Sequence, residues 1–352
     1  MPVREQNGNA PANTHTESEV PTAPAQGRDF FATMLSLVAC VPLGLFLLSF
    51  FSPWLMLAEL AVNFQVQWLV GLLASGLVLL WFRRWWLALV MLLASSVAFA
   101  GIAPVYFPDP SNPPAADTAR LRVMSYNVLV HNRRFAEVLV EIRKRNPDLL
   151  VIVEYTPIWK EALRPLRLDY PYSLEEPRGH GFGIALFSKR PLIESQTIAG
   201  MPVAEEMPAL RATVDFAGRP LEIVATHLIN PLGNSQLELR DRQFQALAAE
   251  LVAEPVERVV VGDFNCTTWS QDLREFLVRT GLRDSRQGFG LQPSWSPEGM
   301  PFLAIPIDHA LVTRGLSVLA REVGAKEGSD HRPVIIDLAW PHAESAAAKD
   351  SN

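Results

Sequence analysis

Three long apolar runs near the N-terminus constrain this chain more than any other feature of its sequence. The runs cover residues 30–58, 60–82 and 85–108. Each run is longer than the roughly 20 residues that an α-helix needs to cross a bilayer. A helix also satisfies its own backbone hydrogen bonds in lipid, which an irregular chain cannot do. We therefore expect an anchor of three transmembrane α-helices over residues 30–103, in contact with a lipid bilayer.

The few polar residues of this region mark the ends of the expected helices. From residue 29 to residue 103 the only charged residues are Asp29, Glu59, Arg83 and Arg84. Tryptophans, which favour the membrane interface, also lie near the ends: Trp54, Trp68, Trp81, Trp85 and Trp86. Residues 53–67 hold Glu59, Asn63, Gln65 and Gln67, and we expect a short loop or interfacial segment there.

The positions of the basic residues predict the orientation of the anchor. Arg83 and Arg84 separate the second run from the third, whereas no Lys or Arg separates the first from the second. The positive-inside rule places this arginine pair in the cytoplasm. The N-terminus is then cytoplasmic too, and the third helix leads to the outer side. We expect a multi-pass protein of the bacterial inner membrane, with its catalytic domain on the periplasmic or outer side.

Composition divides the rest of the chain. Residues 1–29 are rich in Pro, Ala, Thr, Asn and Glu without an apolar period, which is typical of a disordered tail. Five prolines in residues 104–120 indicate a stiff linker. Residues 121–340 form the expected catalytic domain, and residues 341–352 a second disordered tail. From Arg120 onward the chain has 27 Lys and Arg against 30 Asp and Glu, so the domain lacks the basic charge usual in dedicated nucleic-acid binders.

The C-terminal domain has the pattern of an α/β fold. Apolar β-type runs predict strands at residues 121–128, 149–153, 183–187, 211–216, 221–226, 258–261, 307–312 and 333–338. Helical spacing of apolar residues predicts helices around residues 135–142 and 236–250. Such a mixture of strands and helices favours two sheets with helices outside. Arg240 and Gln243 are expected on the surface of the second helix.

Polar side chains recur at the ends of the predicted strands, where α/β folds place their sites. These residues are Asn127, Glu154, His227, Asp263, Asn265, Asp308, His309, Asp330 and His331. Taken singly, each could be a turn or cap residue. In the Gly262-Asp263-Phe264-Asn265 segment, however, two polar groups two residues apart point the same way from an extended chain.

The donor types indicate the metal. Carboxylate and amide oxygens suit Mg²⁺ or Mn²⁺, which would neutralise a phosphate. Zinc fits poorly, because no two histidines have close helical spacing and no cysteine joins the set. The two cysteines, Cys40 and Cys266, lie in different parts of the chain and predict no disulfide framework.

In chain order, these residues resemble the endonuclease/exonuclease/phosphatase superfamily. That group contains pancreatic-type deoxyribonuclease, abasic-site endonucleases, inositol polyphosphate 5-phosphatases and neutral sphingomyelinases. The resemblance covers about residues 121–340 and distinguishes the superfamily rather than a substrate. It implies a four-layer α/β/β/α sandwich of two β-sheets, here preceded by the three transmembrane helices, as in membrane-bound bacterial members.

The resemblance also implies a role for each residue. Glu154 would bind the metal with Asn127 beside it, and Asp330 would lie close to a second metal position. The resemblance implies a catalytic role for His227, Asp263, Asn265, Asp308 and His331. Asp263 would orient the attacking water or assist the leaving group, and Asn265 would donate a hydrogen bond to a phosphate oxygen. His331, oriented by Asp308, would contact the phosphate as an acid or an electrostatic stabiliser, and His227 would be a second histidine facing the phosphate.

Two features bear on how closely the chain follows the family. Val153 stands where the family often has Gln, and weaker support for Glu154 is expected. Ser294-Trp295 resembles a Ser-Trp element of the family, although a packed tryptophan explains it equally well.

These patterns predict a membrane-anchored, Mg²⁺-dependent phosphoesterase that hydrolyses a phosphodiester by direct water attack on phosphorus. A nuclease is the first expectation, because that activity is common in the superfamily. A phospholipid or head-group phosphodiesterase or phosphatase is the alternative. A catalytically inactive, membrane-tethered binding module is a third reading, but it predicts missing site residues, and every expected position is filled. No protein partner is inferred.

Overall fold

Two mixed β-sheets of six strands each form the centre of the C-terminal domain in the computed structural model, which describes residues 25–52, 54–115, 119–198 and 207–341. The first sheet has the order β11-β12-β1-β2-β4-β3 and the second β5-β6-β7-β8-β10-β9. The strands of the first sheet are β1 (Leu121–Asn127), β2 (Leu149–Val153), β3 (Tyr172–Glu176), β4 (Ile184–Ser188), β11 (Ser317–Val323) and β12 (Val334–Ala339). Those of the second are β5 (Leu192–Thr197), β6 (Leu210–Phe216), β7 (Arg219–His227), β8 (Arg258–Asp263), β9 (Arg283–Asp284) and β10 (Asp308–Val312).

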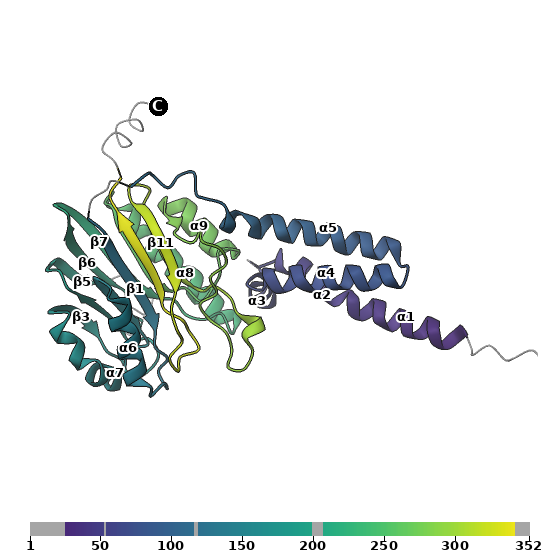
Figure 1. Ribbon diagram of the computed structural model, residues 1–352, viewed down its shortest axis with the longest axis horizontal. Helices are drawn as coiled ribbons and strands as arrows, with labels where there is room; N and C mark the ends of the chain where they lie inside the picture. The colour runs from purple at the N-terminus through teal and green to yellow at the C-terminus, as the bar shows by residue number, and fades with distance from the viewer. Residues whose placement is uncertain (1–24, 53, 116–118, 199–206, 342–352) are drawn as a thin grey trace, which may run out of the picture.

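Apolar side chains on both faces of each sheet explain the layered arrangement. Alternate residues of the two sheets meet in a shared core that includes Val123, Val151, Ile223 and Val261. The opposite face of the first sheet packs against α6 (Phe135–Arg145) and α7 (Pro157–Ala162), and that of the second against α8 (Asn234–Val252) and α9 (Gln271–Thr280). Short 3₁₀ turns, η2 (Arg164–Leu168) and η3 (Pro301–Leu303), complete the domain. The predicted two-sheet α/β sandwich is therefore confirmed (Figure 1).

All eight predicted strands are present, and their ends differ from the prediction by at most two residues. The sequence did not reveal β3, β5, β9, β11, α7 or α9. Most of β5 is exposed, with the sequence LIESQT, so it lacks the apolar run that identified the buried strands. The strand β9 is only two residues long.

A module of helices projects from one end of the domain (Figure 1). Its elements are α1 (Ala25–Ala39), α2 (Val41–Ser49), α3 (Met56–Val62), α4 (Gln65–Trp81), α5 (Trp85–Ile102) and η1 (Ala103–Tyr106). Together, α5 and η1 form one apolar helix of 22 residues, Trp85–Tyr106, which is long enough to cross a membrane. At about 33 Å it matches the roughly 30 Å hydrocarbon core of a bilayer.

The prediction of three full spans is confirmed only in part. Among the described residues one helix passes a test of length and apolarity, and a second passes only if α3 and α4, which are bent by 78°, count as one span. The apolar helix of the first run, Thr33–Ser49, is shorter than that run. The apolar helices are interrupted here because the chain between residues 54 and 67 contains the polar residues Glu59, Asn63, Gln65 and Gln67. Residues 56–62 of this segment form α3, and the buried side chains of Glu59 and of Asn63, which follows α3, bond to the C-terminal domain.

The structure describes part of each boundary segment, and residues 25–29 of the expected N-terminal tail belong to a helix. The helix α1 begins at Ala25, and residues 1–24 of the expected N-terminal tail lie outside the described residues, as do residues 342–352 of the C-terminal one. The proline-rich linker is fixed to the domain by Arg283, which donates to Asp109 at 3.2 Å and Asn112 at 2.8 Å. Cys40 and Cys266 are free thiols.

Candidate active site

The strand register brings the predicted site residues to one end of the two sheets. In the first sheet, β1 and β2 are parallel with Asn127 opposite Val153, so Glu154 follows next to Asn127. In the second sheet, His227 of β7 lies opposite Asp263 of β8, and Asp308 of β10 lies opposite Asp263 on the other side. The segment that leads into β12 adds residues 330 and 331, because β12 runs antiparallel to β1.

Asn127 connects the two sheets through its amide. Its Nδ2 donates to Glu154 Oε1 at 3.0 Å and to Asp263 Oδ2 at 3.1 Å. The other carboxylate oxygen of Glu154 accepts from the backbone N–H of Val130 at 2.6 Å. Each carboxylate oxygen of Glu154 therefore accepts a hydrogen bond. We expected Glu154 to be held more weakly because Val153 replaces the family's Gln, but Asn127 and Val130 hold it in place.

Backbone conformations that are costly for ordinary residues cluster here. Glu154 and Asn265 have φ of 62° and 50°, in the left-handed region that non-glycine residues rarely adopt. Such conformations persist where the surrounding structure imposes them, often at functional sites. Gly262 has φ of 146°, and a Cβ there would lie 1.8 Å from the carbonyl oxygen of Thr226. Only glycine allows β7 and β8 to approach this closely in front of Asp263.

Asp308 and His331 form a buried hydrogen-bonded pair. The distance from His331 Nδ1 to Asp308 Oδ2 is 2.8 Å, and His331 Nε2 lies 3.7 Å from Asp263 Oδ2. Burial alone would lower the pKa of His331, but the carboxylates of Asp308 and Asp263 raise it to about 10. Burial and the charge of Asp308 also raise the pKa of Asp263. The pair therefore holds a protonated imidazole next to a carboxylate that retains a proton more readily than usual.

His227 and Asn265 complete the opposite side. Asn265 Nδ2 donates to the carbonyl of Leu228 at 2.7 Å and lies 3.4 Å from His227 Nε2. Burial and the nearby His331 cation lower the pKa of His227 to about 4, so its ring is neutral at physiological pH. Its nearest carboxylate, which the sequence did not reveal, is Asp263 at 3.7 Å. The ring of Phe182 lies 5.0 Å from the His227 ring, so the segment Gly181-Phe182-Gly183 contributes to the site and is more than a bend into β4.

Ser294 and Trp295 each form a hydrogen bond with a residue of the site. The hydroxyl of Ser294 accepts from the N–H of Asp308 at 3.0 Å, and Trp295 Nε1 donates to Asp330 Oδ2 at 2.8 Å. Ser329 donates to the carbonyl of Asn127 at 2.8 Å. Of the two readings of Ser294-Trp295, the structure therefore favours the one in which both residues position site groups.

The donor set suits a divalent cation. Asp330 Oδ1 is buried and receives no hydrogen bond from any described residue, which leaves a hard oxygen available. Glu154 adds a second carboxylate, partly exposed in the same cavity. Asp263, Asp308 and His331 also place one ligand-type atom each within 4.8 Å of one another. Since the Asp308 and His331 atoms already bond to each other, Glu154 and Asp330 are the better candidates for holding a metal.

A cavity of about 460 Å³ opens above these groups, a size typical of small-ligand sites. Six predicted residues line it: Glu154, His227, Asp263, Asn265, Asp330 and His331. Asn127 and Asp308 lie behind them and act through the hydrogen bonds described above. A larger cavity of about 870 Å³ lies along β5 and β7, but no predicted site residue lines it.

Two expectations about α8 are wrong. Arg240 and Gln243 are fully buried, not on the surface. Arg240 Nη1 donates to the carbonyl of Asn265 at 3.1 Å, and Gln243 Oε1 accepts from the N–H of Ile229 at 2.9 Å. The sequence also gave no sign that Leu60, Asn63 and Phe64 line the catalytic cavity. The only available signal was the polar Glu59 and Asn63 inside an apolar region.

The sandwich and its cluster of carboxylates, amides and histidines define a class of phosphoesterase. The model of the Endonuclease/Exonuclease/phosphatase family matches residues 124–331, and the chain belongs to this family. It is accordingly a metal-dependent hydrolase of phosphate ester bonds.

Solved structures share the fold at low sequence identity. An endonuclease/exonuclease/phosphatase from Beutenbergia cavernae is 21% identical with a TM-score of 0.54, covering 64% of this chain and 73% of that one. A 3′ phosphatase from Neisseria bound to a product DNA hairpin is 20% identical (TM-score 0.53; 62% and 100% covered). TDP2 of D. rerio with a single-strand DNA product is 18% identical (TM-score 0.53; 63% and 99% covered). No curated protein matches the sequence.

Proposed function

We propose that this protein is a divalent-metal-dependent phosphodiesterase in which water attacks phosphorus directly. The observation that carries the proposal is the convergence of Glu154, Asp263, Asn265, Asp330 and His331 on one cavity. Carboxylates for a metal, amides for phosphate oxygens and a cationic imidazole together meet the needs of hydrolysis at phosphorus. No cysteine or lysine lines the cavity among the described residues, and the proposal includes no covalent enzyme intermediate.

Each residue of the site has its own role in the proposed hydrolysis. Asp263 orients the attacking water and takes up its proton, which its raised pKa favours. His331, kept protonated by Asp308, faces the phosphate and stabilises the charge that builds on it. Asn265 and the neutral His227 bind the remaining phosphate oxygens. Glu154 and Asp330, with Asn127 fixing Glu154, would hold Mg²⁺ or Mn²⁺, which supplies positive charge to the phosphate oxygens.

The helical module holds the enzyme at a bilayer in this proposal. Many large apolar side chains on α2, α4 and α5 are exposed, including Leu47, Val70, Leu77, Leu93 and Val97. Such a surface needs an apolar environment. Arg83 and Arg84 occupy the turn between α4 and α5, at the ends of these two helices that point away from the domain (Figure 1). This position supports the predicted topology, with the turn in the cytoplasm and the catalytic domain on the opposite side.

A nuclease is the second candidate, and the charge of the site gives it little support. No Lys or Arg lines the cavity in the part of the chain that the structure describes. Binding to a nucleic-acid backbone depends on several such cations. Two solved structures of similar fold contain product DNA, so nucleic acid is included among the substrates to be tested.

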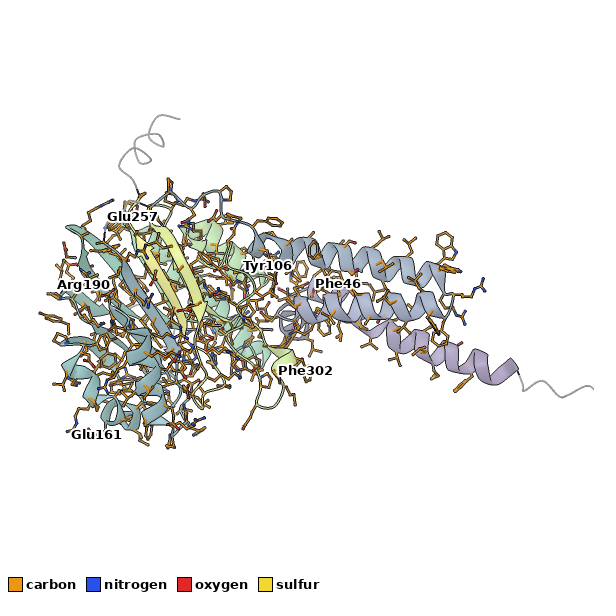
Figure 2. All side chains as sticks on the ribbon, viewed as in Figure 1. Phe46, Tyr106, Glu161, Arg190, Glu257 and Phe302 are labelled. Atoms are coloured by element: carbon orange, nitrogen blue, oxygen red, sulfur yellow. The ribbon has the colours of Figure 1, made fainter. Side chains whose placement is uncertain are left out.

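The test uses the full-length protein in lipid nanodiscs and p-nitrophenyl methyl phosphate, a small diester. We expect hydrolysis with Mg²⁺ or Mn²⁺, abolition by chelator, and a loss of at least about 100-fold in Glu154→Ala. Glu161→Gln on the exposed surface of α7 is the matched control, because Glu161 lies far from the helical module (Figure 2). Hydrolysis that persists in chelator, or that Glu154→Ala leaves intact, would refute the proposal.

A further inference from the structure

The catalytic cavity has a polar end and an apolar end. The carboxylates, amides and histidines described above form the polar end. The rest of the wall is mostly apolar and includes Leu60, Phe64, Phe182, Leu232, Ile305 and Ile307, with Asn63 and Asn230 as its polar members. Neither the phosphate chemistry nor a metal ion uses these side chains. A purely polar substrate would leave them in contact with water or with its own polar groups.

Part of this apolar wall comes from the helical module and not from the catalytic domain. Leu60 and Phe64 lie where the chain bends by 78° between α3 and α4. The bend is fixed to the loop between β8 and α9, residues 264–270, because Asn63 Oδ1 accepts a hydrogen bond from the N–H of Thr267 at 2.7 Å. Trp269 Nε1, in the same loop, donates to the carbonyl of Gly101 at 3.1 Å. The cavity is therefore incomplete without the module.

Exposed apolar side chains continue from the cavity toward the helices. Leu232, at the cavity wall, is 65% exposed, and Phe302 in η3 is 71% exposed. Gln67 of α4 donates to the carbonyls of Phe302 and Ala304, both at 3.1 Å, and so holds η3 against the module. Figure 2 shows Phe302 on the side of the domain that faces the helices. The open rim of the site thus lies next to the surface that we place in the bilayer.

The charge of the cavity limits the phosphate group that it can accept. No Lys or Arg lines the cavity within the described ranges. A polyphosphate or a nucleic-acid backbone would bring several negative charges without partners. A single phosphodiester brings one negative charge, and therefore needs fewer cationic partners than either of these.

We infer that the substrate is a membrane lipid phosphate ester, with its phosphate at Asp263 and His331 and its hydrocarbon tail along Leu60, Phe64 and Leu232. This rests on the proposed phosphodiesterase function and names its substrate class. Water adds its oxygen to phosphorus as the bond from phosphorus to the leaving oxygen breaks. The leaving oxygen receives a proton and departs as an alcohol, and the phosphate monoester remains. The tail does not need to leave the bilayer for this reaction.

The test measures how hydrolysis depends on tail length, independently of any natural head group. Full-length protein in nanodiscs receives p-nitrophenyl methyl phosphate or p-nitrophenyl dodecyl phosphate, and the ratio of their kcat/KM values is compared between variants. For the wild type we expect the dodecyl ester to be preferred. In Leu60→Ser and Phe64→Ser the ratio should fall about tenfold or more, because part of the tail contact is lost. Phe64→Leu, which keeps an apolar side chain and preserves folding, should retain most of the ratio.

Leu93→Ser is the matched control, since Leu93 is an exposed apolar residue of α5 that does not line the cavity. Partitioning of the dodecyl ester into the nanodisc is common to every variant, so only the change in ratio reports on the cavity. An unchanged ratio in Leu60→Ser and Phe64→Ser would overturn the inference, as would faster cleavage of plasmid DNA than of the dodecyl ester. Failure of the proposed function is distinct, because the methyl ester would then not be hydrolysed at all.

Discussion

The carboxylate of Glu59, in the helical module, lies 2.5 Å from the guanidinium of Arg240, in the catalytic domain, and both side chains are almost completely buried. Arg240 also contacts Asp272 at 3.0 Å and donates to the backbone carbonyl of the site residue Asn265 at 3.1 Å. Arg240 thus connects the helical module to the loop between β8 and α9, which contains Asn265. The module is therefore part of the active-site architecture.

Loss of Arg240 should be costly for both stability and activity. Arg240→Met leaves the buried carboxylate of Glu59 without its cation, which typically costs about 3 to 5 kcal/mol, and also removes the partner of the partly buried Asp272. The free energy of unfolding in detergent micelles measures the first effect. We also expect kcat to fall, because Asn265 loses the bond that positions its carbonyl. Arg242→Met, an exposed neighbour on α8, is the control and should change neither quantity. A stable and fully active Arg240→Met variant would show that the connection is dispensable.

The pair of Asp308 and His331 should control the alkaline side of the pH profile. The carboxylates hold the pKa of His331 at about 10, so its proton is retained well above neutral pH. Asp308→Asn removes the larger of these charges. We expect a loss of about 100-fold in kcat, as is usual for a disturbed acid-base group, and an alkaline limb shifted to lower pH. Rate profiles of wild type and Asp308→Asn on the methyl ester check this, with the exposed Asp215→Asn as control. An unshifted limb would argue against the protonated imidazole.

His309 should make the protein less stable in mild acid. It points away from the cavity and bonds to the carbonyl of Cys266 at 2.8 Å, and burial lowers its pKa to about 4. The unfolded chain takes up this proton near pH 6.5 but the folded chain does not, so stability is present above pH 6.5 and falls as the pH drops toward 4. The loss should reach about 3 kcal/mol.

Denaturant unfolding of wild type and His309→Gln across this pH range measures the contribution of His309. His227 has the same sign, since its pKa is also lowered to about 4, so the variant should reduce the slope and not remove it. Equal slopes in the two proteins would contradict the prediction.

Trp295 should affect metal affinity without touching the metal. Its indole N–H donates to Asp330 at 2.8 Å and orients that carboxylate. Hydrogen bonds behind metal ligands typically contribute 10- to 100-fold in affinity, so Trp295→Phe should raise the Mg²⁺ concentration for half-maximal activity by about 10-fold or more. Trp340→Phe is a matched control, because its indole bonds to the carbonyl of Phe216 in the core, away from the cavity. A changed requirement in Trp340→Phe but not in Trp295→Phe would contradict this role.

The sequence predicted those strands and site residues for which the strand itself has a recognisable run of apolar residues. Asn127, Glu154 and Asp263 lie at the ends of buried strands rich in apolar residues, so both the strands and these polar groups could be predicted. The exposed strand β5 had no such signal, because its side chains are not in the core. Arg240 was misplaced for a related reason. Its burial depends on Glu59, 181 residues away along the chain, and no local pattern encodes a pair at that distance.

The position of the helical module could not be predicted either, because it also depends on contacts between residues far apart in the chain. Apolar composition predicted membrane helices, and it could not show that Glu59 and Asn63 would turn α3 toward the catalytic domain. The contribution of Leu60 and Phe64 to the cavity follows from this docking and was invisible in the sequence.

The most direct test of the account is to follow the oxygen of water into the product. Full-length protein in nanodiscs hydrolyses p-nitrophenyl methyl phosphate in heavy-oxygen water with Mg²⁺, and mass spectrometry locates the label. We predict one labelled oxygen on methyl phosphate, none in p-nitrophenol, and loss of the reaction in Asp263→Asn and in chelator. Label in the p-nitrophenol, or turnover that continues in Asp263→Asn, would contradict direct attack of water on phosphorus at this site.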